Sequence, residues 1–153
     1  LLSTTTLSGA STTISSIDQT YVSLVAFIVA DRPAAACGFY VRHNGHSASY
    51  SNFGNQNGTT FGGTNESYFL NAFSATSTTN DNNFTQIVFP YYSATNNKKQ
   101  AIMNRSFRLD SGVRENISSM GSYYADTAAL TSITFIASGS SFSGGTVYLY
   151  GVK

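Results

Sequence analysis

His43 and His46 are the residues whose type and spacing come closest to a metal-binding pair. They stand on either side of Asn44-Gly45, a dipeptide that favours a tight β-hairpin turn. If that hairpin forms, the two imidazoles approach each other and can bind a metal ion. Two ligands leave such a site incomplete, so a third would have to come from elsewhere, for example another subunit. We therefore favour the alternative, in which both histidines bond to neighbouring groups or water, and we expect no cofactor.

Acidic residues offer a second route to chemistry, because hydrolysis by paired carboxylates needs two Asp or Glu side chains at a defined separation. The chain has seven acidic residues, and most fall in predicted turns, where Asp commonly bonds to the backbone. Cys37 is the only cysteine, and its apolar neighbours suit a buried, inert thiol rather than a reactive one. These patterns predict a protein that is not an enzyme.

Tyrosines are the more promising surface feature. Flat rings with a polar tip suit protein interfaces, and they also suit stacking on sugars. The alternative, which we favour, is that these rings fill the core and subunit contacts while each hydroxyl reaches a partner. The tyrosines concerned are Tyr91, Tyr92, Tyr123, Tyr124, Tyr148 and Tyr150.

Composition restricts the kinds of protein that this chain can be. Its 153 residues are enough for one domain. Charged residues make up only 10%, against about 25% in an average soluble domain. The net charge of +1 does not favour nucleic-acid binding.

A basic strip could form from Lys98, Lys99, Arg105, Arg108 and Arg114, but we favour a solvated strand face. No apolar run reaches the roughly 20 residues that span a bilayer, so we expect no membrane partner.

The residues at 21–30 give the strongest strand pattern. Tyr21, Val25, Phe27 and Val29 alternate with Val22, Leu24, Ala26 and Ile28, so both faces are apolar. This pattern predicts a central strand with a second apolar layer or a subunit contact behind it. We expect the segment 31–33 (DRP) to end the strand, because proline cannot donate to the sheet.

The rest of the chain alternates in the same way between turn signals. We expect an extended N-terminal arm over 1–16, a hairpin of 38–43 with 46–53, and polar loops at 55–63 and 74–83. A second hairpin should join 98–109 to 114–120, and the apolar segments 130–137 and 146–152 should close the sheet. Nine or ten strands at this spacing, with little helix, predict an all-β, jelly-roll-like antiparallel β-sandwich over 17–153.

Six segments spread over nearly the whole chain form a recognisable set: 2–11 (LSTTTLSGAS), 15–24 (SSIDQTYVSL), 39–45 (FYVRHNG), 94–99 (ATNNKK), 127–134 (TAALTSIT) and 144–151 (GGTVYLYG). Together they resemble one family, the small virion structural proteins of tailed bacteriophages. These proteins occur as capsid decoration (cement) proteins, head fibres or tail-fibre modules.

The resemblance implies a non-enzymatic jelly-roll protein that is made in the bacterial cytoplasm and ends on the particle surface. It implies a homo-oligomer, with a trimer expected, that contacts the major capsid protein or other virion proteins through the N-terminal arm. The alternative is a glycan-binding receptor module of a tail or head fibre. Because the chain begins with Leu rather than Met, we also expect residues to precede it. Candidate interface or ligand-binding residues are Leu2, Leu7, Tyr21, Val25, Phe27, Val29, Tyr91, Tyr92, Tyr123 and Tyr124.

Overall fold

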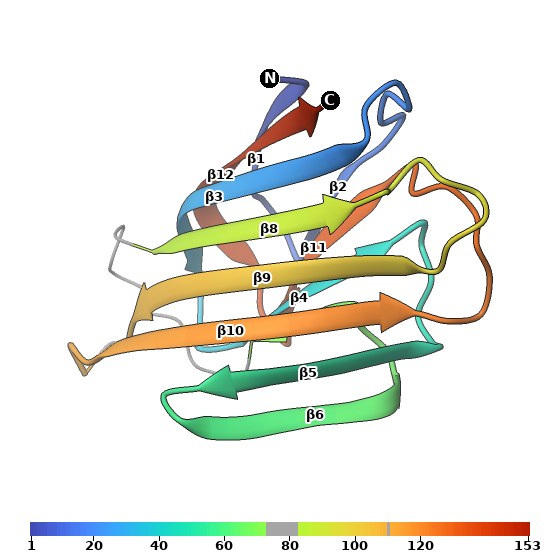
Figure 1. Cartoon of the computed structure of the whole chain (residues 1–153). Coiled ribbons are helices and arrows are strands. Elements are labelled where there is room, and N and C mark those ends of the chain that lie inside the picture. The colour runs from blue at the N-terminus through green and yellow to red at the C-terminus, as the bar shows by residue number, and fades with distance from the viewer. Residues whose placement is uncertain (73–82, 110) are drawn as a thin grey trace.

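The computed structural model describes residues 1–72, 83–109 and 111–153, and this part of the chain is all β. Two antiparallel sheets lie face to face, with the larger sheet in front in Figure 1. No helix occurs in the described ranges, and hence none that could span a membrane. The strands are β1 (Ser3–Thr6), β2 (Ser11–Ile14), β3 (Ser23–Pro33), β4 (Gly38–His43), β5 (Tyr50–Gln56), β6 (Thr59–Glu66), β7 (Leu70–Ala72), β8 (Phe84–Pro90), β9 (Lys99–Arg108), β10 (Arg114–Tyr123), β11 (Ile133–Ser138) and β12 (Phe142–Val152).

The strand order is that of a jelly roll with two inserted hairpins. The large sheet runs β1-β12-β3-β8-β9-β10-β5-β6, and the small sheet runs β2-β11-β4-β7. The first four strands of the large sheet are β1, β12, β3 and β8, and the small sheet has β2, β11, β4 and β7 in the same positions. Each strand of one sheet thus has the strand next to it in the sequence at the same position of the other sheet, which is the arrangement of an eight-stranded jelly roll. Strands β5, β6, β9 and β10 extend the large sheet beyond β8. The predicted jelly-roll-like β-sandwich is therefore confirmed, with twelve strands in the described residues rather than the nine or ten expected.

The core lies between the two sheets, and strict alternation fills it. Residues Leu24, Ala26 and Ile28 of β3 are fully buried, whereas Val25, Phe27 and Val29 are half-buried on the outer face. One face of this strand is therefore buried as predicted, and no second layer of the described chain covers the other face, for which a subunit contact stays a prediction. On β12, Val147 and Leu149 point into the core, and this strand lies inside the sheet between β1 and β3, as its pattern predicts.

The expected N-terminal arm is wrong, because residues 1–16 belong to the sandwich. Strand β1 pairs with β12 in the large sheet, and β2 pairs with β11 in the small sheet. Leu7 lies between these strands and is buried in the core, at 1% exposure. Leu2 is half-buried against the same core. Truncating this segment would therefore remove an edge strand from each sheet.

Two predictions about pairing also need correction. Asn44-Gly45 does form a tight turn, with positive φ at both residues and the His46 N–H donating to the carbonyl of His43. However, β4 then pairs with β11 and β7, while β5 lies in the other sheet, so no hairpin joins them. Residues 55–63, predicted as a loop, instead form much of the β5–β6 hairpin. Of the predicted loop at 74–83, all but Asn83 lies outside the described residues.

The segment 31–33 belongs to strand β3, which ends at Pro33, so the proline does end the strand but three residues later than the apolar pattern predicts. A positive φ of 53° at Ala30 marks an irregularity there, after which Asp31 points into the core. Its Oδ2 accepts a hydrogen bond of 2.6 Å from Nη2 of Arg105, and both side chains are buried. Lys99 is buried as well, so these five cations form neither a basic strip nor the solvated strand face that the sequence favours. The hairpin of β9 with β10, in contrast, lies where the sequence predicts it. The two closing segments do form strands, but β11 belongs to the small sheet and β12 to the large one, so the expectation that they close the same sheet is wrong.

Candidate interaction surface

The outer face of the large sheet carries an apolar row that crosses six neighbouring strands. In the sheet register Tyr150 lies opposite Val25, which lies opposite Val88. The row continues through adjacent strands to residues that are strongly exposed: Ile102 at 42%, Met120 at 61% and Phe53 at 60%. We call these six residues the apolar row.

The row faces outward because every row residue stands next to at least one residue of its strand that is buried inside the sandwich. On β9, for example, Ala101 and Met103 are buried, so Ile102 between them must point to the opposite face. The same holds for Met120 on β10, which stands between the buried residues Ser119 and Gly121. Each row residue is thus fixed by the core packing of its own strand.

The surroundings of the row are polar and uncharged. The outward positions on either side of it carry amides and hydroxyls: Gln86, Asn104, Ser118 and Asn55 on one side, and Gln100, Ser122 and Ser51 on the other. A shallow hollow of about 200 Å³ lies between Phe53, Ile102 and Met120. Covering the row and these neighbours requires no charged group to lose its water, which lowers the cost of burying them.

At the other end of the row, aromatic rings cluster around Phe27. Its ring centroid lies 5.9 Å from that of Tyr150 in an edge-on arrangement and 6.0 Å from that of Phe84 in a stacked one. Tyr21, another predicted interface residue, is half-buried and covers Gly151, where a Cβ would collide with its ring. Of the predicted candidates, Val25 belongs to the row itself, and Tyr21, Phe27 and Val29 lie beside it.

The other predicted tyrosines do not form a common surface. Tyr92 is fully buried and donates its hydroxyl hydrogen bond to the carbonyl of Asp18, so it cannot contact a ligand. Tyr123 is 4% exposed, and it too belongs to the core. Tyr91 is 62% exposed on a turn with a φ of 48°. Tyr124 is exposed and donates a hydrogen bond to Oδ1 of Asn65.

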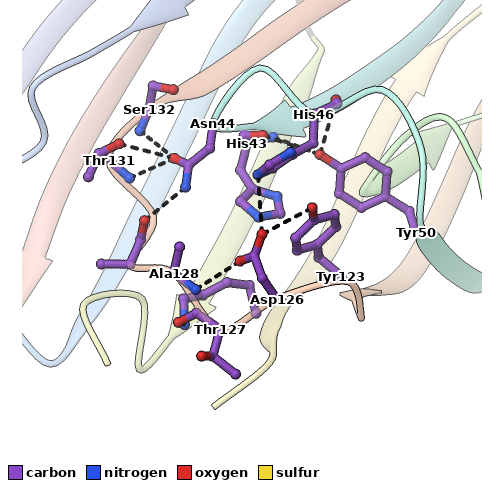
Figure 2. A network of polar contacts seen from close by, with 12 residues as sticks. His43, Asn44, His46, Tyr50, Tyr123, Asp126, Thr127, Ala128, Thr131 and Ser132 are labelled. Carbon is purple, nitrogen blue, oxygen red and sulfur yellow. Dashed lines mark hydrogen bonds and ion pairs between the residues drawn. The ribbon is translucent and has the colours of Figure 1, made fainter. Parts of the chain in front are cut away.

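His43 and His46 do approach each other, as Figure 2 shows, but within a packed aromatic cluster. Their ring centroids are 5.3 Å apart. His46 stacks on Tyr123 at 4.4 Å, and its Nε2 lies 4.0 Å from Oδ2 of Asp126. Tyr123 donates a hydrogen bond to the same carboxylate oxygen, and the Ala128 N–H donates to Oδ1. The cluster fixes the connection between β10 and β11.

Asn44 has a structural role in the same region. Its Oδ1 accepts hydrogen bonds from the backbone N–H groups of Thr131 and Ser132, and its Nδ2 donates to the carbonyl of Ala129. The turn at Asn44-Gly45 is therefore tied to the segment that leads into β11 (Figure 2). The Asn-Gly dipeptide, which in the sequence favours a hairpin, therefore serves here to hold the turn against residues 129–132.

The electrostatics of His43 do not favour acid–base or metal chemistry. Its side chain is buried at 1% exposure, and no partner in the described part of the chain bonds to Nδ1. Burial, with a smaller contribution from the neighbouring His46, lowers the pKa of His43 to about 3. Among the residues that the structure describes, no group of three or more His, Cys, Asp or Glu side chains could hold a metal ion. Cys37 is a free, half-buried thiol whose pKa is raised by burial.

The sequence reading missed Ile102, Met120 and Phe53, the three most exposed members of the row. Each is a single apolar residue on the otherwise polar face of its strand, so no strand reveals the row by itself. The signal appears only when the strands are aligned in register.

The chain matches no model of a protein family and no curated protein sequence.

Proposed function

We propose that this chain is a non-enzymatic structural subunit of a bacteriophage particle that decorates or cements the capsid surface as a homo-oligomer. The observation that carries the proposal is the apolar row, which a second copy of the chain buries. Exposed apolar surface of this extent, bordered by polar groups, is typical of protein–protein contacts. The bacteriophage setting is suggested by the sequence resemblance, and the trimer is the expected oligomer.

The size of the face suits a stable interface between copies. Eight strands spaced about 4.8 Å apart span roughly 34 Å, and the seven residues of β8 extend about 23 Å. The outer face therefore covers on the order of 800 Å², about what each partner of a standard interface buries. Because the row and its border are uncharged, the surface of a neighbouring copy can cover them without repulsion between like charges.

Sedimentation of the purified full chain and of two variants tests the interface. We expect the wild-type chain to be oligomeric at micromolar concentration. Met120→Lys places an ammonium group in the middle of the row and should weaken association at least about tenfold. Val113→Lys makes the same change at a residue that is 55% exposed outside the row and should leave association intact. A monomeric wild-type chain, or an unchanged oligomer of Met120→Lys, would contradict the interface.

Attachment to particles tests the virion role. Particles made without this chain should take up the added wild-type protein and the Val113→Lys variant. If attachment requires the oligomer, they should take up much less Met120→Lys. Failure of the wild-type protein to attach to any such particle would overturn the proposed function.

A further inference from the structure

The outer face of the small sheet holds a hollow of about 550 Å³, a size typical of small-ligand sites. It lies on the opposite side of the sandwich from the apolar row, so an oligomer formed through the row leaves it open. Outward residues of β4 and β11 form its floor: Tyr40 lies opposite Ile136, and Arg42 lies opposite Thr134. Tyr68, which precedes β7, forms part of its wall. We call this feature the small-sheet hollow.

Two stacked tyrosines provide a rigid aromatic surface in the hollow. The rings of Tyr40 and Tyr68 lie 3.8 Å apart and nearly parallel, at 14°. Tyr40 is held flat along its strand because it lies over Gly38, where a Cβ would come within 2.8 Å of the ring. Rings fixed in this way lose little entropy when a ligand contacts them.

Arg42 provides a positive charge that is held in place and that no described carboxylate neutralises. Its Nε donates a hydrogen bond of 2.8 Å to the carbonyl of Ser67, and its guanidinium lies 5.7 Å from the Tyr68 ring centroid. The ion pairs within the described ranges join His46 to Asp126 and Arg105 to Asp31, so no described carboxylate pairs with Arg42. Its Nη1 and Nη2 groups make no hydrogen bond to any described residue, and they remain free to form a two-pronged contact with a carboxylate.

Hydroxyl groups complete the lining. Ser11, Thr134, Ser138 and Ser140 all border the hollow. The Thr134 hydroxyl shares a hydrogen bond of 2.9 Å with Thr13, and the Ser140 hydroxyl accepts one from the Ala35 N–H, so each is oriented by the protein. Groups of this kind exchange hydrogen bonds readily with the hydroxyls of a sugar.

We propose that the small-sheet hollow binds a saccharide that carries a carboxylate. The guanidinium of Arg42 pairs with the carboxylate, the Tyr40–Tyr68 stack contacts the C–H face of the sugar ring, and the hydroxyls bond to its hydroxyls. A small inorganic anion would use only Arg42 and would leave the aromatic surface and most of the volume unused. This proposal does not depend on the virion role, because it uses the other sheet.

A glycan array that contains uronate-, sialate- and ketodeoxyoctonate-bearing oligosaccharides, together with neutral ones, tests the proposal on the full chain. We expect binding to acidic members and not to their neutral or methyl-esterified counterparts. Arg42→Gln should weaken this binding at least about tenfold, since a charge-assisted bond is lost. Arg42→Lys, which keeps the charge without the planar fork, should bind with intermediate affinity. Lys98→Gln removes an exposed charge elsewhere and should bind as the wild type does.

Thermal unfolding of each variant shows whether it is folded before its binding is compared. Tyr68→Ala provides a second test that leaves Arg42 in place, and it should also weaken binding. The proposal is overturned if no acidic glycan binds, if esterified glycans bind equally well, or if Arg42→Gln binds unchanged. Competition by acetate as strong as by the free acidic oligosaccharide would show a simple anion site and would overturn the saccharide assignment.

Discussion

Lowering the pH from neutral should destabilise this protein through His43. The ring of His43 is enclosed by the aromatic rings of Tyr50, Phe69 and Tyr123, with centroids 4.6 to 5.5 Å away. Burial keeps the ring neutral by lowering its pKa to about 3, from 6.5 in the unfolded chain. Below pH 6.5 the unfolded state therefore takes up a proton that the folded state does not, and each such proton favours unfolding.

The size of the effect follows from the two pKa values. One unit of pKa difference corresponds to about 1.4 kcal/mol. The free energy of unfolding should fall by about 2 kcal/mol between about pH 7.5 and pH 5, and by about 3 kcal/mol at pH 4. The loss levels off only as the pH approaches the folded-state pKa of about 3. Hydrogen bonding by the Ala128 N–H also lowers the pKa of Asp126 below 3.8, but that carboxylate affects stability only at the acid end of this range.

Urea unfolding at about pH 7.5 and pH 5 measures the difference, with His43→Phe as the matched variant. In the described part of the chain the His43 side chain makes ring contacts but no hydrogen bond, so Phe keeps an aromatic ring and removes the titration. Each protein is compared with itself at the two pH values, so any packing cost of the extra ring atoms cancels. Equal losses of stability in the wild type and in His43→Phe would refute the assignment to His43.

Three substitutions test the packing. Leu7→Ala should lower the free energy of unfolding by about 2–5 kcal/mol, because Leu7 is a core residue. Urea unfolding measures this change, and a change near zero would show that residues 1–16 form a free arm after all. Gly121→Ala should prevent soluble expression or lower the melting temperature strongly, since a Cβ there would overlap the carbonyl of Phe69. Asp31→Ala should cost about 3–5 kcal/mol by leaving the Arg105 charge buried and unpaired. A double variant that also carries Arg105→Met should recover much of that loss, and thermal unfolding of both would show it.

Alternation along single strands made the fold class predictable. In the closing strand, Val147 and Leu149 alternate with tyrosines, and both point into the core. Such a pattern depends only on the local geometry of an extended chain, in which neighbouring side chains point to opposite faces. The sequence therefore shows which segments are strands and which of their faces is more apolar.

Alternation along a strand does not predict which strands pair with each other. Asn44-Gly45 and Asn57-Gly58 both form turns with positive φ at both positions. The first links strands of different sheets and the second closes the β5–β6 hairpin. The two dipeptides are alike locally, and what separates them is the tertiary environment. Asn44 bonds to the backbone at 129–132, far away in the sequence.

The candidate surface was harder to find than the fold because it depends on register. Ile102, Met120 and Phe53 become neighbours only when β9, β10 and β5 pair in the observed alignment. A shift of one residue in any of these strands would reverse its faces and break the row. Tyr92 failed as a surface candidate for the opposite reason, because its hydroxyl finds a buried backbone partner at Asp18 that no local pattern reveals.

The inserted hairpins explain why the two outer faces of the sandwich differ. Without β9, β10, β5 and β6, the large sheet would keep only Tyr150, Val25 and Val88 of the row, a patch too small for a standard interface. Strand β9 also supplies Arg105, which balances the charge of Asp31 inside the core. The small sheet received no such extension and keeps a polar outer face around Arg42. The insertions thus account for the large apolar surface, while the unextended sheet keeps a polar face that is able to bind a soluble ligand.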